Sequence, residues 1–116
     1  MFSLEFYQSP QGNCPLKKYI KQLTKQHKEE TLTQLLSMLQ LLGKHGLGLK
    51  EIQPKAIKYI KDQIYELRPL PSRVFFFTIE ENRIIILNAF EKKTQKTPKS
   101  EIEIAESYKK DYLKRI

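Results

Sequence analysis

The segment from residue 62 to residue 96 limits the fold more than any other part of the sequence. It contains three apolar runs, at 63–68, 73–79 and 84–90, whose β-branched and aromatic residues predict strands. The sequences PLPS and EENR between the runs predict turns. Because such short connections join antiparallel neighbours, the segment predicts an antiparallel meander, with Ile79 opposite Ile84 across the second turn.

The pairing register predicts that basic side chains gather at one end of this meander. A four-residue first turn sets Arg68 opposite Arg73, and the second hairpin sets Arg73 opposite Phe90. Alternation then places Arg68, Arg73, Phe90 and Lys92 on one face, and Lys93 follows in a basic loop. Facing arginines repel unless an anion lies between them, and their planar forks match phosphate oxygens. We therefore predict a phosphate site at this strand end; an ordinary solvated basic rim is the alternative.

The segments before the meander predict a strand and a helix pair. Residues 2–7 alternate as a short strand, and a helix begins at Pro15 with Asn13 or Cys14 as its cap. A Leu-rich helix at 31–42 follows, and a group of glycines ends it. The two helices are expected to form a hairpin on one face of the sheet.

The remaining segments complete an α+β fold. Residues 49–60 predict a loop with a short strand or a helical turn, and a last helix runs from about residue 98 to residue 115. The expected architecture is an antiparallel sheet packed against an N-terminal helix pair, with a C-terminal helix. A single domain is expected over residues 1–116.

The charge of the chain indicates an anionic partner. Its 116 residues carry a formal net charge of +8, and 40% hydrophobic content argues against disorder, so the charge is expected on a folded surface. Nucleic acid, an acidic membrane surface and an acidic protein are the candidates. Five lysines outside the strand-end group are predicted to contact RNA phosphates: Lys50, Lys55, Lys58, Lys61 and Lys96.

The sequence argues against several other kinds of site. A single cysteine, Cys14, allows no intramolecular disulfide and no Cys-based metal site. There is no HExxH motif, paired Asp motif or Gly-rich phosphate loop, so no metal and no cofactor are expected. The N-terminus lacks the features of a signal peptide, and no apolar run approaches the roughly 20 residues of a membrane span. A cytoplasmic protein is therefore expected.

A cluster of arginines and lysines can support cleavage of RNA without a metal. RNA carries its own nucleophile, the 2′-hydroxyl, so the protein needs to accept its proton, stabilise a pentacovalent phosphorane and protonate the leaving 5′-oxygen. Arginines supply the charge stabilisation. A lysine or tyrosine crowded by cations has a lowered pKa and can transfer the proton.

Three motifs around the predicted meander are specific enough to compare with a known family. They are Glu-Leu-Arg at 66–68, Arg73 at the start of an aromatic strand, and NAFEKKTQKTP at 88–98 followed by a helix of mixed charge. Together they resemble the HigB/RelE toxin family, in particular its phage-derived HigB-like branch. The resemblance implies a RelE-like α+β fold and the toxin of a type II toxin–antitoxin pair. Such toxins are mostly ribosome-dependent endoribonucleases that cut mRNA in the decoding site.

The resemblance also implies roles for individual residues. Arg68 and Arg73 match the strand arginines that bind and stabilise the scissile phosphate, and Lys92 and Lys93 match the basic residues after the last strand. Other members transfer protons with strand lysines or with a C-terminal histidine or tyrosine. This chain has no lysine at the positions of those strand lysines. The candidates for general acid or base are Lys92 and Lys93 first, and then Glu66, Glu91, Tyr108 and Tyr112.

The implied partners are the ribosome, mRNA and a small helix-turn-helix antitoxin, through which alone the toxin would reach operator DNA. No membrane is implied. Two alternatives stay open: a ParE-like gyrase-inhibiting toxin, and a non-catalytic RNA- or ribosome-binding module. The paired arginines and the Lys92-Lys93 sequence favour RNA over gyrase. A binding module would need exposed aromatic rings on its sheet, whereas the aromatic run at 75–77 is expected in the core.

Overall fold

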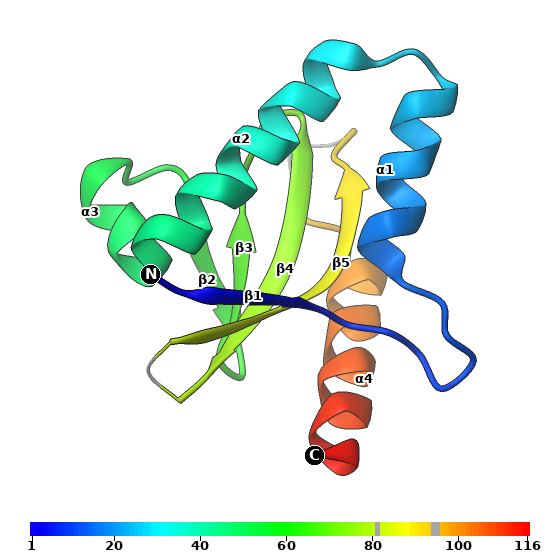
Figure 1. Ribbon diagram of the computed structural model, residues 1–116, viewed down its shortest axis with the longest axis vertical. Helices are drawn as coiled ribbons and strands as arrows, with labels where there is room; N and C mark the ends of the chain where they lie inside the picture. The colour runs from blue at the N-terminus through cyan, green and yellow to red at the C-terminus, as the bar shows by residue number, and fades with distance from the viewer. Residues whose placement is uncertain (81, 94–95) are drawn as a thin grey trace.

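The centre of the fold is a five-stranded sheet in the order β1-β5-β4-β3-β2 (Figure 1). A computed structural model describes residues 1–80, 82–93 and 96–116. The predicted meander is present as three antiparallel strands, β3, β4 and β5. The strands span Ser3–Phe6 (β1), Ile57–Lys61 (β2), Ile64–Leu67 (β3), Ser72–Ile79 (β4) and Arg83–Glu91 (β5).

The sheet is mixed, which corrects the prediction of a purely antiparallel one. β1 lies beside β5 and runs parallel to it, from Ser3 opposite Arg83 to Phe6 opposite Ile86. Parallel neighbours need a long connection, and here three α-helices, a 3-10 turn and three strands separate β1 from β5 in the chain. The local pattern of residues 2–7 predicts the strand, but it contains no information on which edge the strand joins.

The register at the Arg73 end of the meander is the predicted one. Glu66 lies opposite Phe75, Phe75 lies opposite Asn88, and Arg73 lies opposite Phe90. These pairs place Arg73 and Phe90 on the same face of adjacent strands. The predicted pairing of Glu66 with Phe75, of Phe75 with Asn88 and of Arg73 with Phe90 is therefore confirmed.

The register at the β4–β5 turn differs by one residue from the prediction. Ile79 pairs with Arg83 and not with Ile84, because the pairing shifts between Phe75 and Phe76. The shift leaves Leu87 of β5 as the additional residue of a β-bulge. A bulge bends its strand and increases the local twist, so β5 can curve over the sheet while its last residues keep their alignment with β4.

The helices lie on both faces of the sheet. They are α1 (Pro15–Lys25), α2 (Glu29–His45), a 3-10 turn (Gly46–Gly48), α3 (Leu49–Ile52) and α4 (Lys99–Arg115). α1 and α2 cover one face and α4 covers the other (Figure 1). This α+β arrangement is compatible with the predicted RelE-like fold. In the described part of the chain, none of the helices has the length and hydrophobicity needed to cross a membrane.

Two hydrophobic cores follow from this layering. Val74 and Phe76 pack with the leucines of α1 and α2, whereas Phe75 and Phe77 pack with Ala105 of α4. Because side chains alternate along a strand, the consecutive aromatic residues of β4 serve both cores. All three phenylalanines are buried, as predicted.

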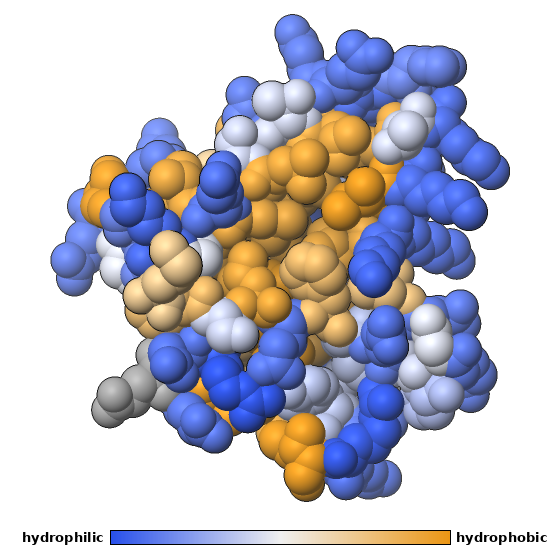
Figure 2. All heavy atoms as spheres, viewed as in Figure 1, coloured by the Kyte–Doolittle hydropathy of each residue, from blue (hydrophilic) through white to orange (hydrophobic). Residues whose placement is uncertain are grey.

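The second of the two N-terminal helices is longer than the sequence indicates. α1 begins at Pro15 with Cys14 as its N-cap residue. α2 extends over Glu29–His45, beyond the predicted 31–42 on both sides. Figure 2 shows hydrophobic residues gathered over α2 and the space between the two helices, and Leu36 of α2 is 48% exposed.

Replacing Gly46 with alanine should destabilise the turn that follows α2. Gly46 has a φ of +59°, and a Cβ atom there would lie 2.5 Å from the Phe2 ring. Backbone strain and overpacking together should lower the free energy of unfolding by about 2–4 kcal/mol. Gly48 has a φ of −63° and open space around it, so Gly48→Ala should change the stability by less than about 0.5 kcal/mol. Urea unfolding measures both, and equal stabilities would contradict the prediction.

Candidate active site

The ends of β3, β4 and β5 bring a group of charged side chains together. We define this strand-end site by Glu66, Arg68, Arg73, Lys92 and Thr97. The backbone N–H of Lys92 donates to the Pro71 carbonyl at 3.0 Å, which ties the residue after β5 to the turn between β3 and β4. The side chains therefore come from segments whose backbones are held against one another.

A single buried carboxylate holds the two arginines. Glu66 is 0% exposed, and its Oε1 accepts a hydrogen bond of 2.8 Å from the Nε–H of Arg68. Arg73 Nε lies 3.6 Å from the same oxygen, an ion-pair distance. The Thr97 hydroxyl donates to Glu66 Oε2 at 2.9 Å. Glu66 thus offsets the repulsion between two guanidinium groups that the strand register places side by side.

Arg73 is a largely buried cation with a fixed position. It is 8% exposed, and one of its terminal amino groups donates to the Ser72 carbonyl at 3.0 Å. Burial lowers the pKa of Arg73, Glu66 opposes that shift, and Arg68 adds to it. Arginine nevertheless stays charged in proteins. The Ser72 and Tyr19 hydroxyls share a buried hydrogen bond of 2.6 Å, so α1 also holds the start of β4.

Lys92 is the one lysine of the strand-end site, and its surroundings lower its pKa. Burial lowers its pKa, and the positive charges of Arg73, Arg68 and Lys58 lower it further, while Glu66 acts in the opposite direction. A lowered pKa increases the fraction of neutral amine at neutral pH. A neutral lysine amine can accept a proton, whereas the neighbouring arginines cannot.

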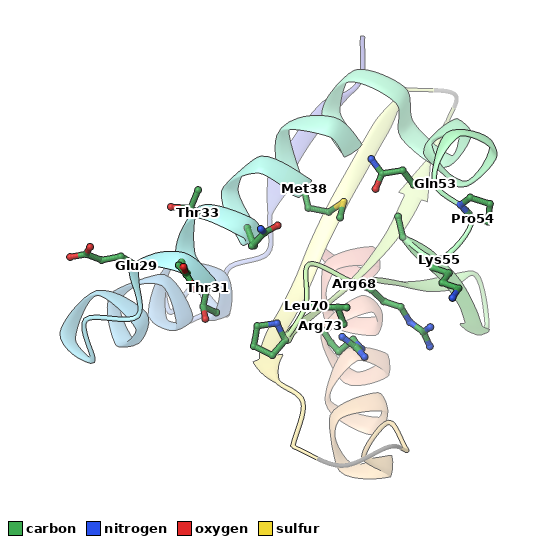
Figure 3. A pocket seen from close by; sticks show the side chains of 14 residues that line it. Glu29, Thr31, Thr33, Met38, Gln53, Pro54, Lys55, Arg68, Leu70 and Arg73 are labelled. Atoms are coloured by element: carbon green, nitrogen blue, oxygen red, sulfur yellow. The ribbon is translucent and has the colours of Figure 1, made fainter.

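A cleft of about 1150 Å³ opens beside the two arginines. The N-terminal half of α2, the segment between α3 and β2, and the β3–β4 turn form its walls. Figure 3 shows Met38, Gln53 and Lys55 pointing into the cleft, with Arg68 and Arg73 at one end. No local pattern in the sequence indicates this cleft, because its walls come from segments far apart in the chain.

Comparison with protein-family models identifies the family of the chain. The model of the family described as phage-derived protein Gp49-like (DUF891) matches residues 18–110. The chain belongs to this family. It is a family of RelE/HigB-like toxins, and the matched range includes the entire strand-end site. No curated protein sequence matches the chain.

Glu91 and Lys93 alternate with Lys92 and lie elsewhere in this Gp49-like fold. Glu91 forms an ion pair of 2.8 Å with Lys28, which follows α1. Lys93 is exposed and borders a separate hollow that Lys28 and Glu91 also line. The structure therefore does not bring these two predicted site residues to the arginine pair, since a one-residue step along an extended chain reverses the direction of the side chain.

Tyr112 also lies away from the strand-end site. Its hydroxyl donates to Glu5 and accepts from Arg83, both at 2.8 Å. Burial raises the pKa of Tyr112, and the bond to Glu5 raises it further. Arg83 pairs with Ile79, six residues along β4 from Arg73, which corresponds to about 20 Å. The position of Tyr112 indicates a structural role, in fixing α4 to the sheet.

Tyr108 lies on α4 and packs against Tyr7, the residue that follows β1. Its ring stacks on Tyr7 with 4.6 Å between the centroids. The Tyr7 hydroxyl donates to Asp111 at 2.7 Å, and burial raises the pKa of Tyr7 to about 12. Both C-terminal tyrosines that the resemblance offered for proton transfer thus belong to the packing of α4.

The lysines predicted to contact RNA are all exposed: Lys50, Lys55, Lys58, Lys61 and Lys96. Two of them lie next to the strand-end site, because Lys55 lines the cleft and Lys58 pairs with Glu66 across β2 and β3. Lys61 forms an ion pair of 3.3 Å with Glu106 on α4. The basic surface around the arginines is therefore formed first by Lys55 and Lys58.

Two contributions to the site have little signal in the sequence. Thr97 reads as the start of a helix, yet its hydroxyl binds Glu66. Tyr19 is one of the buried residues of α1, and its hydroxyl forms a hydrogen bond with that of Ser72. Both are contacts between segments distant in sequence, and local patterns do not predict such contacts.

Replacing Glu66 with glutamine should destabilise the protein by about 3 kcal/mol, because it leaves the buried Arg73 and the partly buried Arg68 without a counter-ion. Glu91→Gln is the matched control. Its ion pair with Lys28 is partly exposed, so its loss should cost less than about 1 kcal/mol. Urea unfolding at neutral pH measures both variants. Equal losses would show that Glu66 does not hold the arginines.

Proposed function

We propose that this protein is the toxin of a type II toxin–antitoxin pair and cleaves ribosome-bound mRNA without a metal. One observation carries the proposal. Within the described residues, Arg68 and Arg73 of the strand-end site share the single carboxylate of Glu66, and Lys92 adds a third positive charge that interacts electrostatically with all three. This excess of positive charge favours a bound anion, and the RNA phosphate has the charge and oxygen geometry that guanidinium groups bind.

The arginines would stabilise the charge that develops on the phosphate. Glu66 takes the Nε–H of Arg68, so the terminal amino groups of Arg68 can bind phosphate oxygens. Arg73 is held by its burial and by the bond to the Ser72 carbonyl. Because both cations are positioned before the substrate arrives, little reorganisation is needed in the transition state.

Lys92 is the general base in this proposal. Its neutral amine takes the proton of the 2′-hydroxyl, whose oxygen then forms a bond to the adjacent phosphorus. The bond from phosphorus to the 5′-oxygen breaks, the departing oxygen takes up a proton from the solvent, and the protonated Lys92 returns its proton to the solvent. The products are a 2′,3′-cyclic phosphate and a 5′-hydroxyl, so no water is consumed. Lys92 is preferred over Lys93 because of its place beside the arginines and the direction of its pKa shift.

The proposal includes the partners implied by the family. The substrate is mRNA on the ribosome, and the exposed Lys55 and Lys58 extend the positive surface beside the site. A small helix-turn-helix antitoxin neutralises the toxin in the cytoplasm and provides its only link to operator DNA. The net charge of +8 is consistent with association with the ribosome and with RNA.

Arg73→Ala should abolish growth arrest and reduce the rate of mRNA cleavage by about 10²–10³-fold, because a preorganised cation at the phosphate is lost. Arg115→Ala, near the end of α4, is the matched control and should leave both unchanged. Cleavage is mapped by primer extension on mRNA from induced cells, and circular dichroism checks the fold. A folded Arg73→Ala protein with full toxicity would contradict the site. DNA damage with intact mRNA would favour gyrase, and ribosome binding without cleavage would favour a binding module.

Lys92→Gln should lower the cleavage rate on programmed ribosomes by about 10²-fold. In the unmodified protein, the rate should rise with pH as Lys92 loses its proton and then level off. Since the pKa of Lys92 is lowered, this rise should lie below the ordinary range of lysine. Lys92→Gln should remove the rise, whereas Lys93→Gln should retain it and change the rate by less than about threefold. An unchanged pH profile in Lys92→Gln would exclude Lys92 as the base.

A further inference from the structure

The cleft beside the strand-end site has a composition that phosphate binding alone does not explain. Its volume of about 1150 Å³ is at the upper end of small-molecule sites and far exceeds the space of one phosphate group. Arg68, Arg73 and Lys55 lie together at one end (Figure 3). Elsewhere the lining carries apolar groups, hydroxyls, neutral amides and, on the first turn of α2, two carboxylates.

The apolar part of the lining suits a flat aromatic ring. Met38 points into the cleft from α2, and Leu70 and Pro71 border it from the β3–β4 turn. Leu70 is 65% exposed, although a leucine gains from burial. A thioether is polarizable and packs well against aromatic faces. A nucleobase placed between Met38 and Leu70 would cover both side chains.

The polar part of the lining can read the edge of such a base. Gln34 of α2 and Gln53 after α3 both line the cleft and offer amide donors and acceptors. Glu29 and Glu30 lie at the other end of the lining, on the first turn of α2. They would repel a phosphate there. The charges therefore favour a single orientation, with the phosphate toward the arginines and the base toward α2.

We propose that this cleft binds one nucleoside of the RNA adjacent to the scissile phosphate, and that Gln34 and Gln53 determine base preference. The inference rests on the proposed function, because it takes the phosphate at Arg68 and Arg73 as the one that is cleaved. It adds the part of the substrate that confers selectivity. Phosphate contacts carry no sequence information, whereas contacts to base edges do.

The two methionines of the chain allow a direct test. Met38 lines the cleft and Met1 is fully exposed, so ¹³C-methyl methionine labelling gives one reporter and one internal control. The labelled protein is titrated with the 3′- and 5′-monophosphates of the four nucleosides, and with inorganic phosphate at matched ionic strength. We expect at least one nucleotide to shift the Met38 resonance and leave Met1 in place. Inorganic phosphate should not reproduce the shift.

Variants then test base reading. Gln53→Ala and Gln34→Ala should each weaken the binding of the preferred nucleotide by about tenfold. They should also change the order of affinity among the four bases. Gln40 is exposed on α2, the helix of Gln34, and lies outside the cleft, so Gln40→Ala should change neither the affinity nor the order of the bases. The same ranking should appear among the cleavage sites mapped in mRNA. Variants that keep the unmodified ranking would overturn the role of these amides.

The outcomes separate this inference from the proposed function. If no nucleotide moves Met38 while the protein still cleaves mRNA in an Arg73-dependent manner, the nucleoside site is wrong and the nuclease remains. If inorganic phosphate shifts Met38 as much as any nucleotide does, the nucleoside site is also wrong. If nucleotides move Met38 and no mRNA is cleaved, the cleft binds nucleotides and the nuclease proposal fails.

Discussion

Glu66 lies fully buried between Arg68 and Arg73, and the polar end of the sheet depends on its charge. A buried carboxylate is costly unless it is paired and hydrogen-bonded, and here two cations and the Thr97 hydroxyl satisfy it. In return, the carboxylate holds two like charges at neighbouring strand ends. Thr97 connects this carboxylate to the segment before α4, and Tyr19 connects the start of β4 to α1. The site is thus fixed from both layers of helices.

The two ends of the sheet balance their charges in different ways. At the hairpin end, Arg83 has its own carboxylate, Glu5, at 2.7 Å, and Tyr112 completes a closed hydrogen-bonded group. At the strand end, Arg73 and its cationic neighbours share only Glu66 among the described residues. The hairpin end therefore holds α4 and β1 in place, while the strand end retains positive charge that can bind an anion. An excess of charge next to a cleft is the physical basis for expecting an anionic ligand there.

The part of the site that follows from strand pairing was predictable, and the part that depends on contacts between layers was not. Turn length and alternation place Arg68, Arg73 and Lys92 at one end, because they act between neighbours in the chain. The bulge at Leu87 leaves that end unchanged and shifts only the pairing toward the turn. Alternation in the same way turns Glu91 toward Lys28, although the sequence alone leaves it among the proton-transfer candidates.

By itself, the sequence determined the elements of this protein, the meander, and the set of basic residues at its end, since hydrophobic periodicity and turn chemistry are local properties. The tertiary structure decided which of those residues meet. It placed β1 parallel to β5, paired Glu66 with the arginines, and used Tyr108 and Tyr112 to pack α4. It also created the cleft beside the site. Each of these outcomes depends on the docking of distant segments, whose geometry is set by the packing of two cores and not by any local pattern.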